Sequence, residues 1–146
     1  MATGTGHGAD AAVAERLATE VLVGGDLDAL EELVTTDVEI RAVGEEGAIE
    51  GREAYREHLA GLRAAFVDLE VETEVLAEAG EWAVVQWAAT GTSEGPFMGL
   101  EPTGEAVSYA GIDAYRFRDG RVAELRSAFD MLGLLTQLDA VEPPWG

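Results

Sequence analysis

The chain has 146 residues, 47% of them hydrophobic, a size and composition that suit one domain with a core of its own and exclude two. It contains no cysteine, which excludes disulfides, thiolate metal sites and cysteine nucleophiles. All nine basic residues are arginines and the formal net charge is −20, a field that repels phosphate backbones and anionic membranes. We therefore expect neither nucleic acid nor a membrane as a partner.

Acidic residues recur along the whole chain between apolar positions, as at Glu70, Glu72 and Glu74, and are not gathered in a tail. The pattern indicates a folded protein with an acidic surface. It resembles proteins of salt-accumulating halophiles, in which concentrated ions screen the surface repulsion; ordinary acidic composition is the alternative. No apolar stretch reaches the roughly 20 residues of a membrane helix, and the start lacks the features of a signal peptide. We expect a soluble, cytoplasmic protein.

Three helices are predicted in the first half of the chain, after a disordered leader at residues 1–9. Asp10 and Asp26 are good N-caps, and apolar residues recur at helical spacing after each of them. Gly24 and Gly25 should end the first helix. The remaining elements of this half are a strand at 38–42, a loop at 43–51 and a third helix at 52–66 with one buried face.

Four strands are predicted in the second half. Residues 69–77 alternate apolar with acidic side chains, the pattern of a half-buried strand. Asp119-Gly120 is a strong hairpin signal, because both residues tolerate positive φ. A short apolar segment at 131–138 closes the domain before a tail at 141–146. The strands are expected at 69–77, 82–92, 105–118 and 121–129.

Three helices followed by an antiparallel meander predict a single α+β domain over residues 10–140, in which a curved sheet wraps the third helix. Such a meander leaves an exposed sheet face or edge, and a symmetric homodimer is the commonest way to cover it. The sequence has no phosphate-binding glycine loop before a helix, no histidine pair at metal spacing and no nucleophile elbow. We therefore expect no nucleotide and no metal.

The order of these elements, together with three stretches of sequence, resembles the SnoaL-like polyketide (ester) cyclase family. The stretches are GTSEGPFMGLEPTG at 91–104, YRFRDGRVAE at 115–124, and Asp130 followed by LLTQL at 134–138. The resemblance covers most of the chain, from about residue 10 to residue 140.

The resemblance implies a cone-shaped α+β barrel of the kind shared with scytalone dehydratase and nuclear transport factor two. A curved antiparallel sheet wraps a long helix, two further helices precede it, and a cavity opens at one end. Family cyclases close a polyketide ring by an intramolecular aldol step without metal or organic cofactor, and use an aspartate as acid/base; the matching position is Asp130. The chain departs from the family at Ser93, Gln86 and Arg126, where histidine, arginine and tryptophan are frequent. Ring closure, isomerisation and hydration therefore all stay open.

The last strand carries the catalytic candidates. Period two along it places Arg126 and Asp130 on one face. If that face lines the cavity, burial and the neighbouring cation act on the proton affinity of the carboxyl in opposite directions, so that Asp130 could exchange protons near neutral pH. Arg126 would then stabilise an enolate. The alternatives are that Asp130 only caps the segment 131–138 and that Arg126 only forms a salt bridge.

Aromatic and long side chains are expected to line the cavity, because ligand pockets are mostly apolar with a few placed polar groups. Gln86 and Tyr109 would supply polar contacts, and His58 has a suitable unperturbed pKa for proton transfer. For each of these residues the alternative is ordinary core packing or a surface position. The substrate-binding candidates are Tyr55, His58, Gln86, Trp87, Phe97, Met98 and Tyr109.

These features predict cofactor-independent acid/base chemistry on a small hydrophobic molecule, with Asp130 as acid/base and Arg126 as electrostatic helper. A ligand-binding module without turnover and a structural protein that uses its barrel to dimerise are the alternatives. An Asp130–Arg126 pair on the wall of an accessible pocket would favour catalysis. Asp130 bonded only to the backbone amides that follow it would favour the alternatives.

Overall fold

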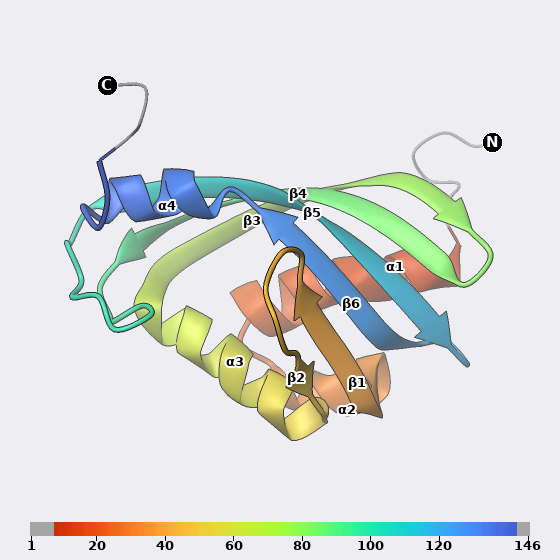
Figure 1. Ribbon diagram of the computed structural model, residues 1–146. Helices are drawn as coiled ribbons and strands as arrows, with labels where there is room; N and C mark the ends of the chain where they lie inside the picture. Colours follow the sequence, from red (N-terminus) through yellow and green to blue (C-terminus); the bar gives the residue numbers. More distant parts are fainter. Residues whose placement is uncertain (1–7, 143–146) are drawn as a thin grey trace.

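The computed structural model describes residues 8–142, so most of the expected leader and the end of the expected tail lie outside the described residues. Six strands form one curved, open sheet in the order β2-β1-β6-β5-β4-β3, and α1 and α3 lie on its concave side (Figure 1). The strands are β1 (Val34–Ala42), β2 (Ile49–Glu50), β3 (Phe66–Ala79), β4 (Trp82–Ser93), β5 (Ala106–Arg118) and β6 (Arg121–Phe129). The helical segments are α1 (Ala9–Arg16), η1 (Leu17–Val23), η2 (Leu27–Ala29), α2 (Leu30–Leu33), α3 (Arg52–Ala65) and α4 (Met131–Gln137).

The α+β fold, with a sheet wrapped around a long helix, is confirmed. Strands β3 to β6 form the predicted antiparallel meander. At the β5–β6 turn, Asp119 (φ 54°) and Gly120 (φ 81°) are both left-handed, as the hairpin signal requires. Two features refine the prediction: β1 pairs with β6 in parallel, so the sheet is mixed, and β2 and β3 remain free edges, so the barrel does not close.

The N-terminal helical region differs in detail from its prediction. The first helix consists of α1 and a π-helical continuation, η1, and begins at Ala9 after Gly8 without a side-chain cap from Asp10. Gly24 ends it by donating its N–H to the carbonyl of Thr19 at 3.0 Å, in a close return of the chain. A Cβ at Gly24 would lie 2.7 Å from the backbone oxygen of Glu20, so only glycine fits there.

Two hydrophobic clusters fill the concave side. The larger joins η1, α2 and β1 to the inward face of β5 and β6, and α3 contributes Tyr55 and Leu59 to it. The smaller lies under α4, where Phe66 packs with Leu134 and Leu138. The β4–β5 connection is held against the end of α3, because Glu94 and Gly95 both donate their backbone N–H groups to the carbonyl of Ala65.

Candidate functional site

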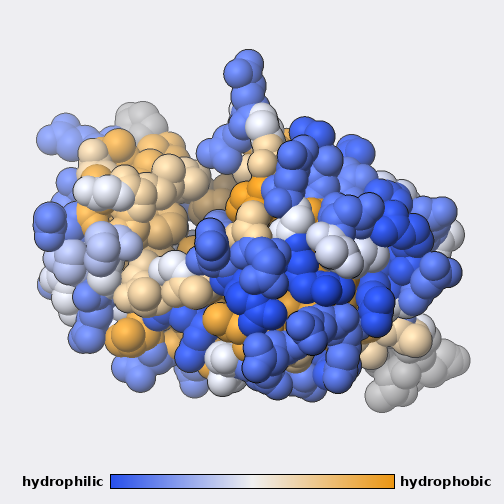
Figure 2. Space-filling view, turned by 90° about the horizontal axis from the view of Figure 1, so that it is seen from below, coloured by the Kyte–Doolittle hydropathy of each residue, from blue (hydrophilic) through white to orange (hydrophobic). Residues whose placement is uncertain are grey.

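A cavity of about 610 Å³ opens between α3, the concave face of the sheet, α4 and the β4–β5 connection. This volume falls in the range of small-molecule sites. Figure 2, which views the molecule from below, shows apolar residues gathered around a hollow over one half of this face, whereas the other half is largely hydrophilic. The wall comes from both hydrophobic clusters, so folding the core also shapes the cavity.

Asp113 is the buried acidic residue of the cavity wall. Period two along β5 turns Tyr109, Asp113 and Tyr115 toward the concave side. Asp113 is only 9% exposed and pairs across the sheet with Ser127 of β6, which also lines the cavity. A carboxyl group is therefore held on the wall of an otherwise mostly apolar space.

Hydrogen-bond donors hold this carboxyl from two sides. Trp87 donates its indole N–H to Oδ1 of Asp113 at 3.0 Å, and Tyr115 donates its hydroxyl to Oδ2 at 3.2 Å. Burial raises the pKa of Asp113 above its ordinary value, and hydrogen bonds from Ser127, Trp87 and Tyr115 oppose that rise in part. The group is thereby placed where a proton can be taken up and released at a higher pH than for an ordinary aspartate.

An aromatic wall stands beside Asp113. The Trp87 and Tyr109 rings meet edge to face at 5.5 Å between centroids, and Phe129 lies 6.1 Å from Tyr109. Gly111 makes this arrangement possible, because a Cβ at that position would lie 2.8 Å from the Trp87 ring and 2.5 Å from the carbonyl of Ala128. The glycine lets the indole cross β5 and reach Asp113 on the next inward position.

Two groups from α3 face the cavity. His58 lies in the lining, and burial lowers its pKa, which leaves the imidazole uncharged at neutral pH. Tyr55 is buried one turn earlier, and burial followed by the nearby Asp113 charge raises its pKa. Neither residue adds a positive charge to the cavity.

Most of the expected binding residues lie in the lining, namely Tyr55, His58, Trp87, Phe97, Met98 and Tyr109. Gln86 does not, because it sits on the opposite parity of β4 and is exposed on the outer face of the sheet. Arg126 is also on the outer face: its side chain is 55% exposed, bonds Glu124 at 2.6 Å and lies over the ring of Trp82 at 5.3 Å.

Asp130 lies outside the cavity lining as well. It is exposed, and its Oδ1 accepts the backbone N–H of Gly133 at 2.8 Å as the N-cap of α4. Arg126 and Asp130 therefore do not share a wall of this cavity. On β6 the residues that face the cavity are Leu125, Ser127 and Phe129. The alternate, charged residues lie on the outer face of the sheet, because burying unpaired charges in an apolar cavity would cost free energy.

Sequence reasoning missed Asp113, Ser127 and Tyr115. A signal was present, since Asp113 is the one acidic residue in the period-two row Tyr109, Gly111, Asp113, Tyr115 and Phe117. An acidic side chain in a row that is otherwise apolar or aromatic either breaks the strand or faces a site, and the hairpin at 119–120 already fixed β5 as a strand.

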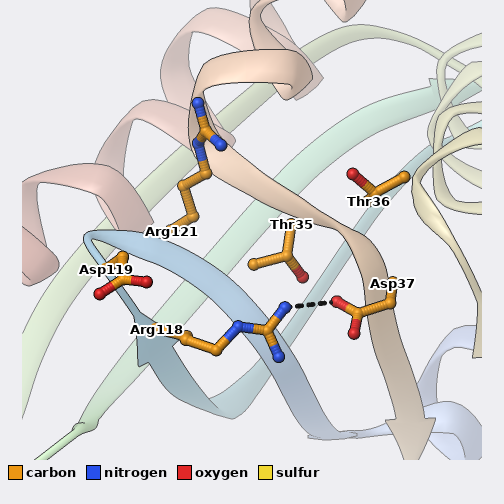
Figure 3. Close-up of a pocket in the computed structure, with 6 residues that line it drawn as sticks. All are labelled: Thr35, Thr36, Asp37, Arg118, Asp119 and Arg121. Atoms are coloured by element: carbon orange, nitrogen blue, oxygen red, sulfur yellow. Dashed lines mark hydrogen bonds and ion pairs between the residues drawn. The ribbon is translucent and has the colours of Figure 1, made fainter.

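A second hollow, of about 440 Å³, lies where β1 meets the β5–β6 turn (Figure 3). Arg118 bonds Asp37 across it at 2.7 Å, and Arg121 points away from that pair. Two arginines and two aspartates leave this hollow without net charge; its lining is Thr35, Thr36, Asp37, Arg118, Asp119 and Arg121. The Arg118–Asp37 pair ties the turn to β1, a structural task.

Within residues 8–142, no group of three or more histidine, aspartate or glutamate side chains could hold a metal ion. No helix of that same range is long and apolar enough to span a membrane.

Comparison with known proteins agrees with this architecture. A family model for the SnoaL-like polyketide cyclases matches residues 12–138. A candidate SnoaL-like polyketide cyclase from Jannaschia sp. CCS1 is 29% identical, with 92% of this chain and 94% of that chain covered and a TM-score of 0.83. IdmH, a candidate polyketide cyclase from Streptomyces antibioticus, is 27% identical, with 89% and 98% covered and a TM-score of 0.72.

A SnoaL-like polyketide cyclase from Agrobacterium tumefaciens shares the fold at 21% identity, with 90% and 99% covered and a TM-score of 0.74. No curated protein sequence matches the chain. The family model spans nearly all of the described residues, and the resemblance seen in the sequence is confirmed. The chain belongs to the SnoaL-like polyketide cyclase family.

Proposed function

We propose that the protein performs cofactor-independent proton transfer on a small hydrophobic substrate enclosed in the 610 Å³ cavity, with Asp113 as the acid/base group. The observation that carries the proposal is a buried carboxyl with a raised pKa on an aromatic wall. General-base catalysis is favoured when the pKa of the base lies closer to the working pH, and burial moves the pKa of Asp113 in that direction. Family membership supports the same class of chemistry.

The step is the removal of a proton from a carbon next to a carbonyl group. The Asp113 carboxylate takes the proton, and the C–H electron pair moves to form an enolate. In ring closure, the enolate carbon forms a bond to a second carbonyl carbon of the same molecule, and the alkoxide produced takes a proton from the Asp113 carboxyl. The hydroxyls of Ser127 and Tyr109 lie in the lining and can donate to the developing negative oxygen.

Hydrogen–deuterium exchange of a bicyclic ketone such as tetralone tests this function without knowledge of the substrate. In deuterium oxide, wild-type protein should exchange the protons next to the carbonyl, as followed by NMR, and Asp113→Asn should not. Calorimetry on the same ketone shows whether both proteins bind it. Equal binding with no exchange by wild type would contradict catalysis and favour the ligand-binding module.

We also propose a homodimer through the outer face of the sheet. Ile112 is 45% exposed at its centre, with the exposed small residues Ala88 and Ala110 beside it. Glu72 of β3 flanks this patch on one side and Arg126 of β6 on the other. A two-fold axis parallel to the strands would set each acidic strand against the arginine side of its partner, which makes the face self-complementary.

Light scattering in high salt tests the assembly. Wild type should have twice the chain mass of 15.4 kDa, and Ile112→Asp should reduce it to a single chain. A wild-type mass of 15.4 kDa at micromolar concentration would contradict the dimer.

The net charge of −20 supports a halophilic origin. Thermal midpoints should then rise with potassium chloride concentration, because ions screen the surface repulsion. A flat or falling series would contradict this origin.

A further inference from the structure

The charges of the cavity wall are all negative. Among residues 8–142, no arginine contributes to the lining, and the sequence has no lysine. The ionisable carboxyls of the wall are Asp113 and the rim residues Glu45 and Glu46. His58 is uncharged at neutral pH. The cavity therefore repels carboxylates and phosphates and attracts cations.

The arginines are engaged elsewhere. Arg16, Arg41, Arg56, Arg116, Arg118 and Arg126 pair with acidic side chains on the surface. Arg52 and Arg63 donate to backbone carbonyls. Arg121, the ninth arginine, lines the second hollow and not the cavity. No described cation is thus placed to neutralise Asp113, although buried carboxylates in proteins are normally paired with a cation or a metal.

The aromatic wall fits a cation as well. The indole N–H of Trp87 bonds the Asp113 carboxyl at 3.0 Å, so the N–H edge of this ring faces the carboxyl, and the Tyr109 ring lies against Trp87 on the same wall. Aromatic ring faces carry a negative electrostatic potential and attract ammonium groups. The counter-charge for an ammonium group and the aromatic residues Trp87 and Tyr109 therefore line the same cavity.

We propose that the cavity binds an aromatic molecule that carries a protonated amine, with the ammonium group against the Asp113 carboxylate on the wall that Trp87 and Tyr109 share. The proposal rests on the proposed function only in that it takes this cavity as the substrate site. The apolar remainder of the wall holds the ring system of the ligand, and the negative rim draws the cation in and excludes acids.

Three naphthalene probes of similar size but different charge test the proposal: naphthylmethylamine, naphthylmethanol and naphthoate. Calorimetry at neutral pH is run in about 1 M KCl, where the Debye length falls to about 3 Å, so that the general attraction of an acidic protein for cations is screened. Wild type should bind the amine about tenfold or more tighter than the alcohol, the size of a buried ion pair with a ring contact, and should not bind naphthoate.

The variants Asp113→Asn and Asp130→Asn each remove one negative charge, inside and outside the cavity respectively. Asp113→Asn should reduce the preference for the amine to about that of the alcohol, whereas Asp130→Asn should keep it. Equal affinities for amine and alcohol in wild type, or a preference that survives in Asp113→Asn, would overturn the proposal. Neither result depends on turnover, so the ketone exchange experiment judges the proposed function separately.

Discussion

The two faces of the sheet place carboxyl groups from neighbouring strands in opposite environments. On the outer face, Glu124 lies between Arg126 at 2.6 Å and Arg116 at 3.1 Å, and hydrogen bonding from Arg126 lowers its pKa. On the inner face, Asp113 meets only neutral donors, and burial raises its pKa.

The difference shows that the partners of a carboxyl decide its chemistry more than its place on a strand. An arginine partner fixes the charge, which suits a structural ion pair. Neutral donors in an apolar cavity let the carboxyl take up a proton more readily, which suits acid/base work. Both arrangements occur within the same β5–β6 hairpin.

The largest effect is expected from filling the inner face at Gly111. Gly111→Val would drive a side chain into the Trp87 ring and the carbonyl of Ala128, at a cost of about 1–3 kcal/mol in unfolding free energy. Ala106→Val, on the outer face of the same strand and away from the proposed dimer patch, should cost much less because that position is exposed. Urea unfolding of both variants makes the measurement, and equal losses would show that the two faces do not differ in packing.

Removing one donor from the inner carboxyl should have a moderate effect. Tyr115→Phe deletes the hydroxyl that bonds Asp113 at 3.2 Å, at a cost of about 1 kcal/mol. Because the lost donor favoured the ionised carboxyl, the pKa of Asp113 should rise further. The rate of ketone exchange should then begin to rise with pH at a higher pH than in wild type. An unchanged pH profile would refute the role of Tyr115 as a positioning residue.

Asp130 offers the contrast at the end of β6, where it caps α4. Asp130→Ala should cost about 1 kcal/mol of stability, and Asp130→Asn only a few tenths, because asparagine caps about as well as aspartate. Chemical denaturation gives both values. Loss of ligand binding in a stably folded Asp130→Asn variant would place this residue in the site after all.

The smallest expected effect is a pH-dependent difference in stability between wild type and Asp113→Asn. The pKa of Asp113 in the folded protein exceeds the ordinary value of 3.8, which applies to the unfolded chain. The stabilising contribution of the protonated carboxyl is therefore complete below pH 3.8 and is lost as pH rises through the folded-state pKa. Wild type should therefore lose stability relative to Asp113→Asn over this window. A difference that stays constant with pH would contradict the raised pKa.

The sequence predicts the fold well because the signals are local and strong. Alternating acidic residues defined β3, and Asp119-Gly120 defined the turn between β5 and β6. The parallel pairing of β1 with β6 joins residues far apart in the chain, and no local signal reports it.

The site was predicted only in part. Residue type alone predicts the aromatic lining. The inward face of β6 is harder to predict, because period two allows either the row with Arg126 or the row with Ser127 to face the cavity, and the structure places Ser127 there. A β-bulge near Phe117 adds to the difficulty, since both Val122 and Ala123 are buried and simple alternation fails at the start of the strand. The resemblance to the family predicts Asp130 as the acid/base residue, whereas the alternation of residues in β5 places Asp113 on the inward face.

The most direct test of the account compares Asp113→Asn with Asp130→Asn in ketone exchange, with both variants checked for folding. The two substitutions change charge and volume alike, but Asp113 lines the cavity, whereas Asp130 is exposed and caps α4. Asp113→Asn should lose about a hundredfold or more of the exchange rate, the scale of general base catalysis, and Asp130→Asn should keep the wild-type rate. Exchange that survives in Asp113→Asn and disappears in Asp130→Asn would contradict it.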